Sequence, residues 1–155
     1  MGSKRLEGKI ALVSGAGQRG NVIGTGRASA MLFSQAGAKV CLVDWNEESA
    51  AETQSIIESD GGTAFVKQAD VTKDTDCKAA IDSCINEFGS LDIVLNNVGG
   101  PGGGDVTELT ENLWEESLDR NLKSAAFMSK HAVPAMANSG GGSIIHVASI
   151  DGYRA

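Results

Sequence analysis

Residues 14–28 read Ser-Gly-Ala-Gly-Gln-Arg-Gly-Asn-Val-Ile-Gly-Thr-Gly-Arg-Ala, and this glycine-rich stretch decides the fold. The apolar run just before it, residues 9–14, predicts a short buried strand. The stretch leads into residues 24–36, where apolar side chains recur at helical spacing until Gly37 ends the helix. A strand, a glycine turn and a helix in this order let backbone N–H groups at the positive helix end face a phosphate. A glycine turn needed only for helix packing is the less favoured alternative.

The rest of the chain repeats the alternation of strand and helix. The predicted strands are 39–44, 63–70, 91–95 and 143–148, and the triple glycine 140–142 is expected to turn into the last of them. The predicted helices are 47–58, which Asn46 would cap, 74–88, which Gly89 would end, and 110–136, whose last turn Pro134 would weaken. Apolar strands alternating with amphipathic helices indicate an α/β fold with a doubly wound parallel sheet. No linker or repeat interrupts it, so residues 1–155 are expected to form a single domain.

Composition excludes several classes of protein. The chain has 155 residues, 41% of them hydrophobic, which suits one domain with a proper core. A formal net charge of −7 argues against a nucleic-acid partner. No apolar run reaches the length of about 18 residues that a membrane span needs. Three cysteines without Cys-x-x-Cys spacing favour a cytoplasmic, reducing location and no metal site.

Asp44 ends the second predicted strand and is the candidate residue for selecting between the dinucleotides NAD and NADP. A carboxylate there can accept hydrogen bonds from both adenosine ribose hydroxyls and would repel a 2′-phosphate, which favours NAD over NADP. Arg19, within the glycine loop, is the opposing signal because a guanidinium could pair with that phosphate. A surface aspartate that caps the next helix is the remaining alternative.

Four further segments complete a pattern. They are Asp70-Val71, Asn96-Asn97-Val98-Gly99, Arg120-Asn121-Leu122 and Ser149, each at or beyond the end of a predicted strand or within a helix. With the glycines they resemble the short-chain dehydrogenase/reductase family over essentially the whole chain. The glycine motif of that family, Thr-Gly-x-x-x-Gly-x-Gly, corresponds to 14–18 and 24–26, with about five extra residues before the last two glycines.

The resemblance implies an enzyme with a nicotinamide cofactor and a small alcohol or ketone substrate. Asn121 would hold an active-site water and Ser149 would bind the substrate oxygen, which makes these two the implied catalytic residues. Whether residues 21–23 or Thr25 hold the pyrophosphate stays open, because the glycine loop is longer than in the family. The implied cofactor-binding residues are Gly15, Gly17, Gln18, Ile23, Asp44, Trp45, Asp70, Val71, Asn97, Val98 and Gly99.

The resemblance also implies parts that this sequence lacks. The family places a Tyr-x-x-x-Lys segment beyond the serine, whereas Tyr153 follows Ser149 by only four residues and the sequence ends at Ala155. A lysine ammonium lowers the pKa of such a tyrosine so that it can exchange a proton with the substrate. We expect the 155 residues to be the first part of a longer enzyme, with five of its seven strands, and to be inactive alone.

Several readings remain beside NAD-dependent interconversion of a secondary alcohol and a ketone. A nucleotide-binding module without catalysis shares every motif, and the long glycine loop also suits an enoyl reductase. A hydrolase built from His146, Ser149 and Asp151 is disfavoured, since neighbours on one strand cannot readily converge. His146 is expected in the packed core and His131 on a helix surface or at an interface. The helix around Phe127 and Val133 is apolar on more than one side, which suits a homodimer or homotetramer interface or a buried core helix.

Overall fold

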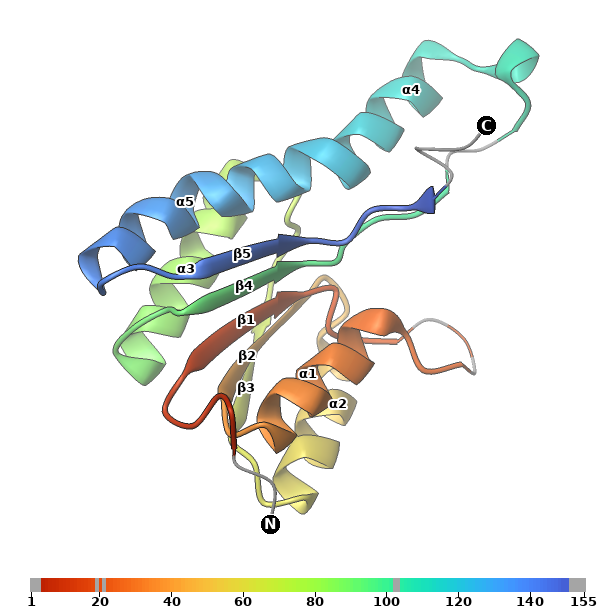
Figure 1. The fold of residues 1–155 in the computed structure, drawn as a ribbon. Coiled ribbons are helices and arrows are strands. Elements are labelled where there is room, and N and C mark those ends of the chain that lie inside the picture. The colour runs from red at the N-terminus through yellow and green to blue at the C-terminus, as the bar shows by residue number, and fades with distance from the viewer. Residues whose placement is uncertain (1–3, 19, 21, 102–103, 151–155) are drawn as a thin grey trace.

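The computed structural model describes residues 4–18, 20, 22–101 and 104–150. They form five parallel strands flanked by helices (Figure 1). The strands are β1 (Ile10–Ser14), β2 (Lys39–Asp44), β3 (Ala64–Gln68), β4 (Ile93–Asn96) and β5 (Ser143–His146). The helices are α1 (Thr25–Gln35), α2 (Glu47–Ser59), α3 (Asp74–Phe88), α4 (Glu111–Leu118) and α5 (Ser124–Asn138), with short turns η1 (Val106–Glu108) and η2 (Asp119–Lys123).

The strand order is β3-β2-β1-β4-β5, and all pairs are parallel. Successive side chains of β1 pack into the hydrophobic cores on opposite faces of the sheet. Leu12 belongs to the core beneath α3 and α5, and Val13 belongs to the core beneath α1 and α2. The sheet is therefore covered on both faces, which confirms the doubly wound α/β fold.

Local signals set the ends of the helices as the sequence predicts. The Asn46 side chain accepts a hydrogen bond from the Ser49 amide at 3.0 Å and caps α2. Gly89 ends α3 in the left-handed region at φ 88°, which costs a glycine little. Gly140 and Gly141 also have positive φ and turn the chain into β5, as expected.

The predicted long helix 110–136 is wrong in one respect, because it is divided by the π-helical turn η2. The side chain of Asn121 is the local cause. Its amide donates to the Ser117 carbonyl at 2.9 Å, and its oxygen accepts from the Gly100 amide at 2.9 Å. A side chain that bonds within the helix and across to a loop favours such a wide turn. The helix then runs past Pro134 to Asn138.

Two smaller predictions also need correction. The third strand ends at Gln68 rather than Asp70, because the Asp70 carboxylate accepts from the Thr72 amide and starts a turn. His146 is exposed rather than packed in the core. It lies on β5, an edge strand that pairs only with β4 among the described strands, and its Nδ1 lies 3.2 Å from the side-chain Nδ2 of Asn96.

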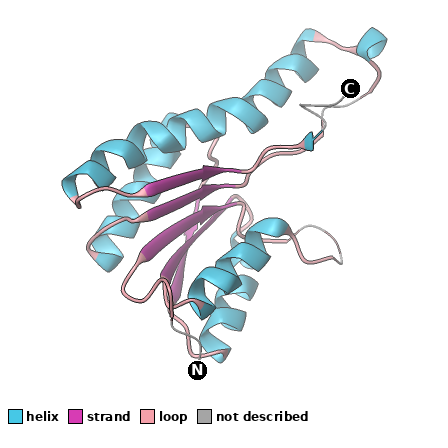
Figure 2. Ribbon diagram, viewed as in Figure 1, coloured by secondary structure: helices cyan, strands magenta, loops and turns pink. Residues whose placement is uncertain are grey.

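Parallel strands bring their carboxyl ends to one edge of the sheet. The loops that follow β1 and β4 leave the sheet at this edge, beside the start of α1 (Figure 2). Strand order reverses between β1 and β4, since one connection runs toward β2 and the other toward β5. A ligand is expected in the crevice at such a switch point.

Candidate functional site

A cavity of about 790 Å³ opens at the carboxyl edge of the sheet. Its walls come from the loops after β1, β2, β3 and β4 and from the region where α4 meets η2. Ten of the eleven predicted cofactor-binding residues line it, and Ile23 is the exception: the ten are Gly15, Gly17, Gln18, Asp44, Trp45, Asp70, Val71, Asn97, Val98 and Gly99. Ile23 lies in the loop before α1 and is largely exposed.

The glycines of the loop after β1 allow an unusually close approach of backbone to backbone. A Cβ placed on Gly26 would lie 1.9 Å from the Gly15 carbonyl oxygen, so no larger residue fits there. Gly15 has φ 68°, and its carbonyl accepts a hydrogen bond from the Asn97 side chain at 3.1 Å. The start of α1, the end of β1 and the end of β4 are thereby held together at the floor of the cavity.

Asp44 holds the glycine loop from the end of β2. One carboxylate oxygen accepts from the Gly17 amide at 2.8 Å, and the other accepts from the Asn46 amide at 3.0 Å. Each oxygen keeps a further lone pair, and Asp44 lines the cavity. The carboxylate is therefore fixed in place and still able to accept hydrogen bonds from a ligand.

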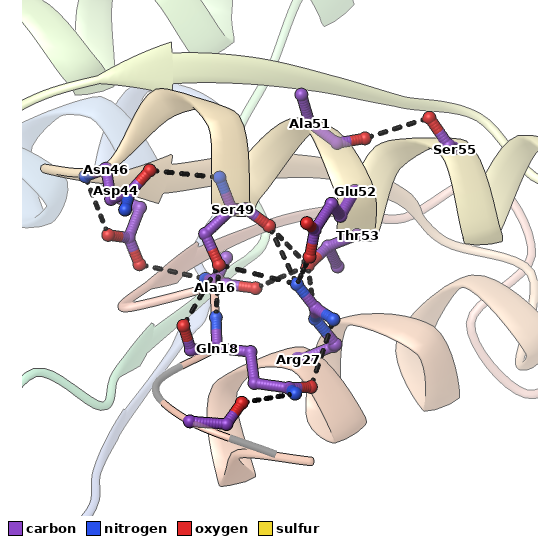
Figure 3. A network of polar contacts seen from close by, with 12 residues as sticks. Ala16, Gln18, Arg27, Asp44, Asn46, Ser49, Ala51, Glu52, Thr53 and Ser55 are labelled. Carbon is purple, nitrogen blue, oxygen red and sulfur yellow. Dashed lines mark hydrogen bonds and ion pairs between the residues drawn. The ribbon is translucent and has the colours of Figure 1, made fainter. Parts of the chain in front are cut away.

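Ser49, in the first turn of α2, holds the next residue of the loop (Figure 3). Its hydroxyl accepts from the Gln18 amide at 2.7 Å and donates to the Gln18 carbonyl at 3.1 Å. The amides of Gly15 and Ala16 bond to the Val43 carbonyl. The four amides of residues 15–18 are thus all occupied by bonds within the protein.

Arg27 joins α1 to α2 beneath the loop, and its side chain is only 7% exposed (Figure 3). The guanidinium donates to the Thr53 hydroxyl at 2.9 Å, the Ser49 carbonyl at 2.9 Å and the Gln18 side chain at 3.0 Å. It also pairs with Glu52 at 2.8 Å. A buried charge bonded in this way is costly to leave unpaired, so Arg27 ties the loop to α2.

Within the described part of the chain, no side chain caps the N-terminus of α1, which lies at the cavity. Gly24 occupies the N-cap position and has no side chain with which to cap the helix, and the first turn carries no acidic residue. Thr25 and Gly26, in that turn, line the cavity. The positive end of a helix dipole with uncapped amides is suited to an anion such as a phosphate.

The segment after β3 forms the adjacent wall. Val71 is buried, whereas Trp45, the residue that follows β2, is largely exposed. Both line the cavity. The Asp70 carboxylate accepts from the Thr72 hydroxyl at 2.7 Å and from the Thr72 amide at 3.1 Å. The hydrogen bond from the Thr72 hydroxyl is the main cause that holds the pKa of Asp70 below its usual value.

Replacing Asp70 by asparagine is expected to reduce the free energy of unfolding near pH 7 by less than about 1 kcal/mol. The folded-state pKa of Asp70 is lowered, so its stabilising effect is present above its ordinary pKa of about 3.9 and is lost as the pH falls through the folded value. Urea unfolding at pH 7 and near pH 3 should show a larger difference at the higher pH. Asp60→Asn, at an exposed aspartate, is the control; an equal difference at both pH values would contradict this account.

The two implied catalytic residues lie outside the set that lines the cavity. Asn121 uses its side chain to bond Gly100 and Ser117 in η2, beside the cavity residues Asp119 and Arg120. Ser149 follows β5 and is exposed. Arg19, Asn21, Asp151 and Tyr153, which the sequence analysis considered, lie outside the described residues.

Several site residues were missed from the sequence. Ser49 and Arg27 are ordinary polar residues of helices, with nothing in their spacing that singles them out, and Arg120 stands out in the sequence only as the neighbour of Asn121. Ser49 lies three residues after the N-cap, which places it on the first turn of α2, but its contact with Gln18 bridges 31 positions. Only the packing of α2 against the glycine loop reveals it.

Two absences hold for the described part of the chain. None of its helices combines the length and the apolar character needed to cross a bilayer. Likewise, its histidine, cysteine, aspartate and glutamate side chains form no group of three that could hold a metal ion.

Comparisons with known proteins now add to this geometry. Residues 9–155 match the family model described as short chain dehydrogenase. The chain is 34% identical over 151 residues to cyclohexanol dehydrogenase from Acinetobacter sp. (strain SE19), covering 97% of this chain and 58% of the relative. It is 33% identical over 146 residues to 7alpha-hydroxysteroid dehydrogenase from Escherichia coli (strain K12), covering 94% and 55%.

Solved structures agree with these sequence matches. A short chain dehydrogenase from Mycobacterium smegmatis superposes with a TM-score of 0.93 at 29% identity, covering 99% of this chain and 63% of that one. The hydroxysteroid dehydrogenase from Escherichia coli gives a TM-score of 0.86 at 33% identity, covering 94% and 60%. The chain thus spans little more than half the length of these curated relatives. The family model matches nearly the whole chain, and the chain belongs to the short-chain dehydrogenase family.

Proposed function

We propose that this chain is the dinucleotide-binding part of an oxidoreductase that prefers NAD and interconverts a secondary alcohol and a ketone. The observation that carries the proposal is the joint position of two features on one cavity. The uncapped N-terminus of α1 suits a pyrophosphate, and the Asp44 carboxylate suits a ribose diol. Both lie at the switch point of the sheet.

The hydrogen bonds of the loop support an assignment of the pyrophosphate donors. The amides of residues 15–18 are engaged within the protein, so we assign the pyrophosphate to the first turn of α1, at Gly24, Thr25 and Gly26. Ile23 would contribute from the residue before the N-cap. Gly15, Gly17 and Gln18 would shape the cradle without donating their amides.

The remaining cavity residues are assigned by their place on the wall. Asp44 would accept hydrogen bonds from the adenosine ribose, while Trp45, Asp70 and Val71 would flank the adenine, for which Trp45 offers an aromatic face. Asn97, Val98 and Gly99, after β4, would lie toward the nicotinamide half. Repulsion between Asp44 and a 2′-phosphate supports NAD over NADP.

A bound nicotinamide cofactor would supply the hydride acceptor or donor. The Ser149 hydroxyl would donate a hydrogen bond to the substrate oxygen, because it lies beyond β5 at the same edge of the sheet as Asn97. Asn121 would keep η2 in its wide turn through its bonds to Gly100 and Ser117, and so hold the water site that the family resemblance implies. The proton exchange itself is proposed to need residues beyond this segment.

Binding of NADH and NADPH to the purified protein, measured by calorimetry, tests the cofactor assignment. We expect the Kd for NADH to be lower by tenfold or more, about 1.4 kcal/mol, because the 2′-phosphate would approach Asp44. Equal or tighter binding of NADPH would contradict the role of Asp44.

Turnover separates the enzyme from the other readings. The full-length protein is expected to reduce NAD with a panel of secondary alcohols. Binding of NADH without oxidation of any alcohol would favour a nucleotide-binding module, and reduction of unsaturated substrates alone would favour an enoyl reductase.

A further inference from the structure

The cavity wall carries an excess of negative charge. Four carboxylates line it, those of Asp44, Asp70, Glu116 and Asp119, and Arg120 is the one basic residue among its described lining. A dinucleotide brings two phosphate charges into this field. Without a compensating cation the approach of these charges would be unfavourable, since like charges repel strongly in a partly desolvated site.

Arg120 can supply the positive charge that compensates the phosphates. Its side chain is half-buried, and its guanidinium forms no hydrogen bond or ion pair with another described residue. The neighbouring Asp119 is already paired with Lys123. Arg27 differs in this respect, because five hydrogen bonds within the protein occupy its guanidinium.

The backbone of Arg120 is held firmly beside the cavity. Its carbonyl accepts from the Ser124 hydroxyl at 2.6 Å, and the next residue, Asn121, accepts from the Gly100 amide at 2.9 Å. A Cβ placed on Gly100 would lie 3.5 Å from both Cδ and Nη1 of Arg120. The side chain therefore lies along the loop after β4, at the rim of the cavity.

The first turn of α1 and the turn η2 offer different kinds of donor to the site, backbone amides from the one and a side-chain cation from the other. On one side the amides of residues 15–18 are engaged, which leaves the first turn of α1 as the source of backbone donors. We propose that Arg120, from η2 on the helices that cover the other face of the sheet, binds a phosphate of the dinucleotide. This inference rests on the proposed function and adds a cationic residue to the same site.

The proposal is tested by measuring ligand binding to the purified full chain and to three variants. Arg120→Met and Arg120→Lys change the proposed residue. Lys78→Met is a control that removes one positive charge elsewhere. Lys78 is exposed on α3 and pairs with Asp82. The Kd values for NADH and ADP are measured by calorimetry, and that for adenosine, which has no phosphate, by displacement of NADH. We expect Arg120→Met to weaken NADH and ADP about tenfold and adenosine little. Arg120→Lys should restore most of the affinity, and Lys78→Met should match the wild type.

The salt dependence gives an independent readout. The difference between wild type and Arg120→Met should shrink as the ionic strength rises, because ions screen a partly exposed charge pair. Unchanged affinity in Arg120→Met, or equal losses for adenosine and ADP, would overturn the phosphate contact while leaving the proposed function intact. If the wild type binds neither NADH nor ADP, the proposed function fails and the role of Arg120 fails with it.

Discussion

Replacing Gly26 by alanine is expected to cost at least about 3 kcal/mol of folding free energy and to abolish NADH binding. The added Cβ would lie 1.9 Å from the Gly15 carbonyl oxygen and 2.6 Å from the Asn97 side-chain nitrogen. The first of these atoms belongs to backbone, so α1 would have to move away from the end of β1. This movement would break the floor of the cavity.

Gly24→Ala is the matched control, two positions away in the same loop. Its Cβ would lie 3.7 Å from the Gly17 carbonyl oxygen, an ordinary contact, and φ at Gly24 is −76°. We expect a loss below about 1 kcal/mol, from the weaker N-cap. Urea unfolding of the two variants makes the comparison, and equal midpoints would show that the close approach of Gly26 to Gly15 is absent.

Replacing Asp44 by asparagine is expected to weaken NADH binding by about 10- to 100-fold, the range for a lost hydrogen bond to a charged group. Asparagine has one acceptor oxygen where the carboxylate has two, whereas Gly17 and Asn46 both donate their amides to Asp44. NADPH should lose less affinity or gain some, because the negative charge that would face the 2′-phosphate is gone. The ratio of the Kd for NADPH to the Kd for NADH should therefore fall.

This ratio is the decisive measurement, because any unfolded fraction of the variant affects both ligands equally. Asp60→Asn removes the same charge from the exposed end of α2 and should leave the ratio unchanged. If Asp44→Asn also leaves it unchanged, another group sets the cofactor preference.

Local signals account for most of the fold. The apolar runs predicted β1 and β2 within a residue of their bounds, and Asn46 and Gly89 marked the ends of helices by hydrogen bonding and by positive φ. The cavity residues at or just beyond the ends of strands, such as Asp44 and Asn97, could also be predicted, because parallel strands bring their carboxyl ends together. These features depend on neighbours in the sequence or on strand order alone.

Other features depended on contacts between distant segments. The wide turn η2 arises because Asn121 bonds to Gly100, 21 positions away, and no helical periodicity encodes that bond. Exposure of His146 follows from the place of β5 at the edge of the described sheet. The pairing of the loop amides with Asp44 and Ser49 likewise appears only when β2 and α2 are packed against the loop.

The sequence by itself determined the doubly wound fold, the glycine loop and the carboxylate at the end of β2, because periodicity, turn chemistry and strand order are local properties. Tertiary structure alone decided which loop amides and which guanidinium lack a partner among the described residues. Arg27 and Arg120 are the same residue type, yet one is bonded beneath the loop and the other lines the cavity. The availability of a polar group depends on every neighbour around it, and those neighbours come together only on folding.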